Sequence, residues 1–525
     1  MKKQRMLALF VSAAMALSIA ACGSSNETVS ESAAQSNGNA AESAESGGEK
    51  ADNGEVTTIK ISYPCLVVVP SEEGTVQVEE SINQYLEEKG ENVRIDLDPV
   101  DGNNYTTQVD MQIVSGESVD IYLPMTGLDA AVQSNKVVPL DDYLDKELSG
   151  AIEVMGADFI KNCVFDGKTY GIPCYKGSVL LYYWVCDKEV FESLGIDRGS
   201  ITNVREIEPI LAKIHEMYPD KAAIAPGVGA NGAGNNFNLL AVLAGEGDYE
   251  VTNLNNGLCI IGDDLTVQNM YATDYFKEVC KIAYEWNQNG YVLKDASVTT
   301  DTPMDLVRSG RAASYMIGYA YDTESVEATT TTGSNPYETV AIPVSKDMLN
   351  PITLTWSIAY TCKNPDAAAK VLNMLYTDEF VLNSIIFGVE GIDWVDAGVG
   401  DGSITWPEGK AMDTVPYTAA LTCGIMGNQF KMYSMEGVTK ASDIPFMAKN
   451  MEESKKSPVF GFAVNIEKVK TQTSAISNVI KQYEGGLYTG ELDPEVYIPK
   501  MLEELENAGI NDVVAEAQKQ LDAWK

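Results

Sequence analysis

The sequence is nearly devoid of histidine. His215 is the single histidine among 525 residues, and histidine is the side chain most often used as a general base or metal ligand near neutral pH. It lies at the flank of an apolar helical stripe that includes Ile207, Leu211 and Ile214, the position of a half-exposed structural histidine. We therefore do not expect a Ser-His-Asp or Cys-His enzyme.

Paired cysteine motifs are also missing. None of the nine cysteines forms a C-x-x-C pair, so the sequence gives no support for a zinc or redox motif. Most of the eight cysteines after Cys22 lie in apolar runs such as 184–186 and 258–260, which is the usual setting of buried free thiols. Disulfide pairing stays open at this point. The acidic run around Asp141 lacks the spacing of an EF-hand loop, and we expect neither a metal site nor a cofactor.

Basic residues are scarce. The chain has 76 Asp and Glu against 37 Lys and Arg, a net charge of −39. The first 21 residues hold three of the bases and no acid, so without them 76 acids face 34 bases, a net charge of −42. Such a surface repels nucleic acid phosphates and anionic lipids. The charge excludes nucleic acid as a partner and favours a neutral or cationic ligand.

The amino terminus resembles an export signal. A basic segment, KKQR at 2–5, precedes an apolar run at 6–21 that is too short for a typical membrane-spanning helix. The run ends in IAACG at 19–23, which resembles the lipobox of bacterial lipoproteins. The resemblance implies a signal peptide at 1–21 and a lipid on the Cys22 thiol, holding the protein at the extracellular face of the cell membrane of a Gram-positive host. A plain signal peptide with a chance cysteine is the alternative.

Residues 22–55 consist mainly of Ser, Ala, Asn, Gly and Glu, with Val29 as the only larger aliphatic residue. Such a composition cannot bury enough apolar surface to fold. We expect a disordered acidic tether.

The chain after the tether alternates strand and helix patterns. Strands are expected at 57–69, 93–99 and 119–123 and helices at 76–89 and 105–115. This order predicts a parallel α/β lobe, in which ligands lie beyond the carboxyl ends of the strands. Those ends carry Tyr63, Met125 and Thr126.

A second lobe is expected after residues 166–177. Asp166-Gly167 predicts a turn, and Pro173 interrupts the short strand that follows, as at the edge of a sheet or where the chain leaves it. An edge hairpin is the alternative. Further elements are expected at 179–186, 204–218, 274–289 and 312–321, a return crossing at 339–343, a first-lobe strand at 351–360, and closing helices that begin at Pro494 and end at Gly509 and Trp524.

Several segments resemble one family. They are MQIVSGESVDIY at 111–122, VVPLDDY at 137–143, DGKTYGIP at 166–173 and FGVEGIDW at 387–394. In this order they resemble bacterial ABC-transporter extracellular solute-binding lipoproteins (family 1-like), and 458–525 resembles a C-terminal domain of unknown function found in Gram-positive members. Residues 184–186 depart from the family's usual tyrosine and asparagine, so no ligand role is carried onto them.

The resemblance implies a type II-like, two-lobe periplasmic-binding fold of class α/β, in which each lobe is a mixed sheet flanked by helices and a hinge joins the lobes at a cleft. We assign 56–172 plus 345–388 to lobe 1. We assign 177–340 plus 392–525 to lobe 2, including a C-terminal helical region at 455–525. The resemblance also implies ABC permease subunits as partners and no covalent chemistry, and we expect a monomer.

Aromatic rings and short polar groups near the expected cleft are the candidate ligand contacts, since rings offer sugars a flat apolar face and polar groups take hydroxyls. They are Tyr63, Met125, Thr126, Tyr175, Lys176, Asn235, Asn236, Tyr319, Trp356 and Glu390. Core packing is the alternative for each aromatic residue, and an ion pair is the alternative for Lys176. The glycine-rich loop at 227–234 lacks the Gly-Lys-Ser/Thr of a phosphate loop.

The sequence thus predicts a lipid-anchored receptor that delivers a ligand to an ABC importer. The favoured ligand is an oligosaccharide or another carbohydrate. Three alternatives stay open. One is a receptor for peptides or other small solutes. Another is a surface carbohydrate-active hydrolase, which would need two facing carboxylates. The third is an inert adhesin.

Overall fold

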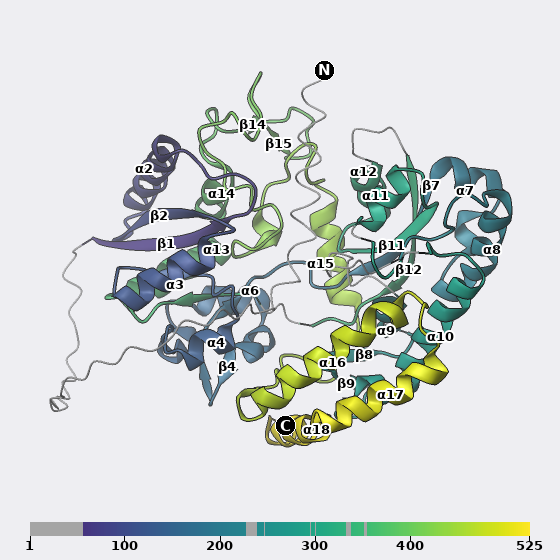
Figure 1. Cartoon of the computed structure of the whole chain (residues 1–525). Helices are drawn as coiled ribbons and strands as arrows, with labels where there is room; N and C mark the ends of the chain where they lie inside the picture. Colours follow the sequence, from purple (N-terminus) through teal and green to yellow (C-terminus); the bar gives the residue numbers. More distant parts are fainter. Residues whose placement is uncertain are drawn as a thin grey trace, which may run out of the picture.

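The computed structural model describes residues 56–226, 239–245, 247–294, 296–299, 301–331, 338–350 and 354–524. Figure 1 shows one lobe on the left, a second on the right, α15 (Asp443–Glu453) between them, and three long C-terminal helices on the right-hand lobe. The predicted two-lobe α/β architecture is confirmed. None of the helices in these ranges combines the length and apolar character that a bilayer crossing requires.

The first lobe is built on five strands: β1 (Thr57–Cys65), β2 (Val93–Asp101), β3 (Ile121–Tyr122), β6 (Ile172–Pro173) and β13 (Thr355–Ile358). Their order in the sheet is β2-β1-β3-β13-β6. β1 runs parallel to β2 and β3, whereas β13 is antiparallel to β3 and β6. The carboxyl ends of β1, β2, β3 and β6 therefore share one edge of the sheet with the amino end of β13.

Helices cover this sheet: α2 (Glu72–Glu88), α3 (Tyr105–Ser115), α4 (Leu128–Gln133), α5 (Asp141–Leu144), α6 (Ser149–Met155), η3 (Ala157–Cys163), α13 (Pro365–Thr377) and α14 (Glu379–Phe387). Local sequence sets their ends. The Ser71 hydroxyl accepts a hydrogen bond from the Gly74 amide at the start of α2, so this helix begins earlier than predicted. Gly116, with φ 81°, ends α3 as predicted.

The expected turn at Asp166-Gly167 joins two short strands, β4 (Val164–Phe165) and β5 (Lys168–Thr169). Both turn residues have positive φ, 50° and 77°, which glycine adopts freely and aspartate tolerates. This hairpin delivers the chain to β6 at the edge of the first sheet.

The second lobe has two antiparallel three-stranded sheets, so the prediction of a mixed sheet holds for the first lobe and is wrong for the second. One has the order β11 (Ser314–Tyr319), β7 (Leu181–Asp187), β12 (Thr339–Lys346), and the other has the order β10 (Gln268–Asn269), β9 (Leu258–Ile261), β8 (Val251–Asn255). Its helices are α7 (Lys188–Leu194), α8 (Glu208–Met217), α9 (Leu239–Ala244), α10 (Asp274–Gln288), α11 (Pro303–Arg308) and α12 (Thr323–Thr331). Short 3-10 turns are η4 (Arg198–Ser200), η5 (Val204–Glu206) and η6 (Met270–Ala272).

Three C-terminal helices pack on the second lobe: α16 (Lys470–Tyr488), α17 (Pro494–Asn507) and α18 (Ile510–Trp524), after a short turn, η8 (Glu467–Val469). Asp493 caps α17 and Pro494 opens it, as predicted. Buried residues of these helices, among them Ile476, Met501 and Leu521, belong to the same apolar core as α10. The C-terminal region therefore completes the second lobe.

The assignment of all of 392–525 to lobe 2 is wrong for its first part. Buried residues Ile404, Tyr417, Leu421, Met426 and Met435 belong to the core of the first lobe. This part carries only short regular elements, β14 (Val395–Asp396), β15 (Ile404–Thr405) and η7 (Gln429–Lys431). It therefore has no periodic apolar face that would indicate which lobe it packs on.

The return crossing also lies later than predicted. β12 pairs with β7 along the whole of Thr339–Lys346, so residues 339–343 belong to the second lobe. The chain passes between the lobes in three places: at 174–180, between Lys346 and β13, and at 436–442.

The cysteines and the single histidine lie mostly in buried or half-buried surroundings. The eight cysteines of the described ranges are free, and six of them are buried. His215 is half-buried at the flank of α8, edge-on to the Tyr291 ring at 5.8 Å, as the structural interpretation predicts.

Candidate functional site

The direction of the strands shows which edge of each sheet lies next to the crossings between the lobes. In the first lobe, β6 leads directly into the first crossing, so the edge that holds the carboxyl ends of β1, β2, β3 and β6 faces the second lobe. In the second lobe, Leu181 at the start of β7 pairs with Tyr319 and Lys346 at the ends of β11 and β12. Both sheets thus meet the crossings at the edges where α/β proteins hold ligands.

Hydrogen bonds fix the first crossing against the first lobe. The Tyr175 amide donates to the Gly427 carbonyl at 2.9 Å, and the Gln429 amide donates to the Tyr175 carbonyl at 2.8 Å. The Gly177 amide donates to Gln429 Oε1 at 3.1 Å. The Lys176 ammonium donates to the carbonyl oxygen of Cys423. The candidates Tyr175 and Lys176 are therefore held side by side at the junction of the lobes.

Aromatic rings gather at the same junction. The ring of Tyr175 is half-buried and lies 5.5 Å from Phe159 and 5.0 Å from Phe430. Phe430 and Tyr319 both pack against a buried second-lobe cluster that includes Ile317 and Tyr321. Burial raises the pKa of Tyr175, so its phenol stays protonated and can donate a hydrogen bond.

Tyr319 ends β11 and stacks on Tyr321, with ring centroids 6.0 Å apart and an interplanar angle of 21°. It is partly exposed. Burial raises its pKa to about 12, with Arg308 opposing that shift. The phenol of Tyr319 is therefore neutral at physiological pH.

Two further candidates lie on the first-lobe edge. Met125 and Thr126 follow β3, the first partly exposed and the second exposed. Glu390 is exposed on a separate turn at 388–394, away from the crossing strands.

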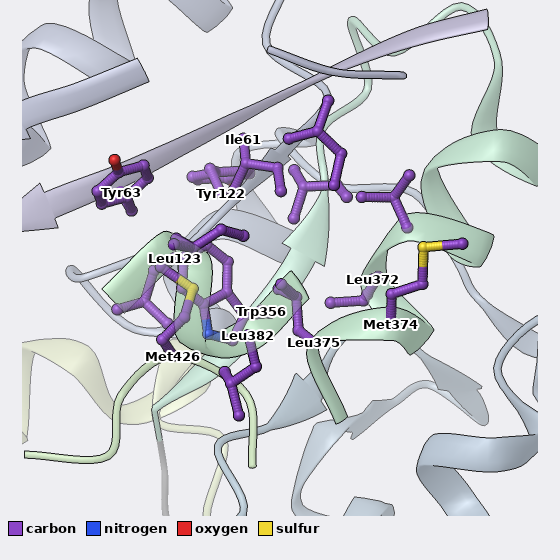
Figure 2. Close-up of a cluster of buried hydrophobic side chains, with 14 of the residues drawn as sticks. Ile61, Tyr63, Tyr122, Leu123, Trp356, Leu372, Met374, Leu375, Leu382 and Met426 are labelled. Carbon is purple, nitrogen blue, oxygen red and sulfur yellow. The ribbon is translucent and has the colours of Figure 1, made fainter. Parts of the chain in front are cut away.

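The candidates Tyr63 and Trp356 lie inside the first lobe, as Figure 2 shows among aliphatic side chains that include Leu375, Leu382 and Met426. Both are fully buried. The Tyr63 hydroxyl shares a 2.7 Å hydrogen bond with that of Tyr417, and the Trp356 indole donates to the Ile425 carbonyl at 2.8 Å. Their surroundings favour the core-packing alternative. Asn235 and Asn236 fall outside the described residues.

Sequence reasoning missed Phe430, Tyr321 and Gln429. Phe430 and Gln429 lie in a 3-10 turn of the irregular part of the chain, and Tyr321 follows the end of a strand. These three residues are candidates only because they lie next to residues of the crossings. That position results from contacts between distant parts of the chain, so no local sequence pattern could reveal it.

The first two crossings pack against α15 and the residues that follow it. The Leu349 amide donates to the Lys455 carbonyl at 2.8 Å and the Ser457 amide to the Leu349 carbonyl at 3.0 Å. Val179, Leu349, Met451 and Phe460 form one buried cluster there. Gly177 lies so close to Met447 of α15 that an added Cβ would be 2.6 Å from its Sδ. The second crossing is thus bonded to residues 455–457, which follow α15, and the first crossing packs against both the second crossing and α15.

A small cavity of ≈ 40 Å³ lies inside the second lobe. Its lining is mostly apolar: Ile224, Ala225, Pro226, Leu239, Ala283, Trp286, Val292, Met316, Tyr488 and Thr489. It has room for a few waters and not for a sugar. No group of three or more potential metal ligands occurs within the described ranges.

Comparisons with known proteins agree with this arrangement. The family model "Bacterial extracellular solute-binding protein" matches residues 71–381, and a "Domain of unknown function (DUF3502)" matches 458–525. A carbohydrate ABC transporter substrate-binding protein of Streptococcus pneumoniae serotype 4 is 25% identical over 448 residues, covering 84% of this chain and 86% of that protein.

Solved structures share the fold. An N-glycan transport solute-binding protein from Streptococcus pneumoniae superposes with a TM-score of 0.70 at 23% identity, covering 89% of this chain and 98% of the other. A solute-binding protein from Bifidobacterium longum infantis, described as binding HMO, gives a TM-score of 0.59 at 16% identity, covering 90% and 99%.

Proposed function

Because the chain belongs to the bacterial extracellular solute-binding proteins, we propose that it captures a carbohydrate, specifically an oligosaccharide, between its lobes and delivers it to an ABC importer. The observation that carries the proposal is its alignment, over 84% of its length, with a carbohydrate ABC transporter substrate-binding protein.

The side chains at the junction support a sugar. Tyr175, Phe430 and Tyr319 present rings from both lobes, and a pyranose ring packs its C–H face against such surfaces. Lys176 and Thr126 add polar groups for hydroxyls. The acidic surface, with 76 acids against 37 bases, disfavours an anionic sugar.

The proposed mechanism is binding and closure without covalent chemistry. A ligand held by both lobes stabilises the conformation in which the lobes are together, because only that conformation offers it all contacts. The three crossings act as the hinge. The closed monomer then docks on the permease subunits of the importer.

We further propose that Cys22 carries a diacylglycerol and that the signal peptide at 1–21 is removed, anchoring the protein outside the cell membrane. Mass spectrometry of the mature amino terminus tests this. A lipid on Cys22 supports the anchor, whereas a free thiol or cleavage elsewhere overturns it.

Calorimetric titration of the wild-type protein against a panel of neutral oligosaccharides tests the sugar assignment. Mannose and N-acetylglucosamine oligosaccharides come first, since a structural relative was solved in complex with Man1GlcNAc. We expect saturable one-site binding to at least one member. Absence of binding to the whole panel, together with binding of peptides, would reassign the protein to peptide transport.

A further inference from the structure

The two lobes touch directly beside the first crossing. The first lobe contributes η3, and the second lobe contributes residues 456–461, which follow α15. Lys456 Nζ donates to Asp158 Oδ2 at 3.0 Å. The rings of Phe159 and Phe460 meet edge to face, with their centroids 5.0 Å apart. We call these two residue pairs the η3 contact.

The second-lobe half of the η3 contact is held by the residues on either side of Lys456. Lys455 forms an ion pair with Glu250 at 2.7 Å, and the Ser457 hydroxyl shares a buried 2.8 Å hydrogen bond with that of Thr252 in β8. Successive side chains of an extended segment point in opposite directions. Lys456 therefore points to the first lobe while its two neighbours hold the segment on the second.

The first-lobe half is equally well held. Phe159 packs on the core of the first lobe. Asp158 pairs with Lys161 at 2.9 Å as well as with Lys456, and these two ammonium groups hold the pKa of Asp158 below its usual value. Its carboxylate is therefore charged at neutral pH. Gly461 lies so close to η3 that an added Cβ would be 2.6 Å from the Cβ of Lys161.

The first crossing lies between the η3 contact and the candidate ring of Tyr319. Near the amino end of α15, Ile444 packs on the second-lobe cluster against which Tyr319 lies, and Ser442 Oγ donates to Asp322 Oδ2 beside α12 at 3.5 Å. Gly177 of the first crossing packs against the middle of this 11-residue helix. The carboxyl end of α15 leads into the η3 contact. In Figure 1, α12 lies near the upper end of α15 and β8 lies below its lower end.

This position determines what closure does to the η3 contact. Closure rotates the lobes about the crossings. Groups on opposite sides of a rotation axis move in opposite senses, so the lobes separate at the η3 contact when they approach each other at Tyr319. The η3 contact is formed in the structure. It therefore belongs to the open arrangement of the lobes, and closure has to break it.

The η3 contact is weak enough for a ligand to break. The side chains of Lys456 and Asp158 are 53% and 48% exposed, so water and salt screen their attraction. The ring pair adds only the modest stabilisation of one edge-to-face contact. A contact of this strength shifts the equilibrium between open and closed arrangements by a small factor.

We propose that the η3 contact holds the lobes in the open arrangement and so sets the affinity for the oligosaccharide from a place that the ligand does not touch. This inference rests on the proposed function, since it requires a receptor that closes on its ligand. Asp158 and Lys456 are positioning residues. When their pair is lost, a larger fraction of the protein is closed, and the apparent dissociation constant falls in proportion.

Lys456→Gln and Asp158→Asn test the proposal, because each removes the ion pair and leaves both rings in place. The probes are Man1GlcNAc and the other members of the neutral oligosaccharide panel, titrated by calorimetry. We expect either substitution to raise the association constant about two- to fivefold, as the loss of one exposed ion pair allows. The double variant should show no further gain, because both substitutions break the same pair.

Salt gives a second readout, which a merely structural role would not change. The ligand is neutral, so salt acts on binding through charges of the protein alone. Raising sodium chloride from about 0.05 to about 0.5 M should strengthen binding to the wild type and leave binding to Lys456→Gln unchanged.

Lys455→Gln is the matched control. Lys455 is the neighbouring lysine, and both of its ion pairs, to Glu250 at 2.7 Å and to Asp263 at 3.0 Å, stay within the second lobe. Its loss removes as much charge without touching the first lobe. The association constant of Lys455→Gln should equal that of the wild type.

The outcomes separate the two claims. If the wild-type protein binds no member of the panel, the proposed function fails and the role of the η3 contact fails with it. If the wild-type protein binds, and Lys456→Gln and Asp158→Asn bind equally well or more weakly, the function stands and the role of the η3 contact is overturned. An equal gain in Lys455→Gln would show a general effect of charge and would also overturn it.

Discussion

Aromatic residues occur both in the interior of the first lobe and at the junction between the lobes, but their surroundings differ. Tyr63 and Trp356 are fully buried, and their polar atoms are satisfied by Tyr417 and Ile425. Tyr175 and Tyr319 are only partly buried, and they lie at the edges from which the chain crosses. Exposure and position therefore separate the aromatic residues that pack the core from those that we propose to bind ligand. The comparison predicts that substitutions in the interior change stability, whereas those at the junction change affinity.

Trp356→Ala should have the largest effect on stability. Removing a fully buried indole leaves a cavity and leaves the Ile425 carbonyl with only the weak thiol donor of Cys174, and we expect a loss of about 3–5 kcal/mol in the free energy of unfolding. Urea denaturation followed by circular dichroism measures it. A loss below about 1 kcal/mol would show that Trp356 is not part of the core.

Gly177→Ala tests the hinge. The new methyl group would lie 2.6 Å from Met447 Sδ, so the Met447 side chain or the first crossing must shift, at about 1–3 kcal/mol. A double-mutant cycle with Met447→Ala measures the coupling. We expect the double variant to be less destabilised than the sum of the single variants. Strict additivity would contradict the packing of α15 on the crossing.

Tyr175→Ala should act on binding. Loss of a half-buried ring at the junction should weaken oligosaccharide affinity about tenfold, with a much smaller effect on stability than Trp356→Ala. Calorimetry and thermal melting on the same sample separate the two effects. Tyr360→Ala is the control, since Tyr360 is 48% exposed and follows the opposite end of β13. Equal affinity in wild type and Tyr175→Ala would remove Tyr175 from the site.

A further prediction concerns Asp347 at the second crossing. Its Oδ1 accepts a 2.7 Å hydrogen bond from Tyr182, and burial raises its pKa from 3.8 to about 7. The folded protein favours the protonated acid, so this contribution to stability is present below about pH 4 and is lost as the pH rises through about 7. Asp347→Asn mimics the neutral acid. Melting curves should show it gaining stability relative to wild type between pH 4 and pH 8, and a constant difference would contradict the shifted pKa.

Sequence reasoning predicted the elements with regular periodicity or clear end signals. The first-lobe strands, the turn at Asp166-Gly167 and the helix that opens at Pro494 follow from local chemistry. It misplaced residues 404–435, because short strands and 3-10 turns carry no amphipathic period. For the site it proposed Tyr175, Lys176 and Tyr319 from strand ends, and their role in ligand binding stays a prediction. The sequence could not show that Trp356 is buried whereas these residues are partly exposed. Burial at a strand end depends on which other parts of the chain pack there.

A crystal structure of the protein saturated with the oligosaccharide that calorimetry identifies tests the central claim most directly. We predict electron density for a sugar ring between Tyr175 of the first crossing and Tyr319 of the second lobe, with both lobes in contact with it. A ligand bound to one lobe alone, or remote from the crossings, would contradict the account.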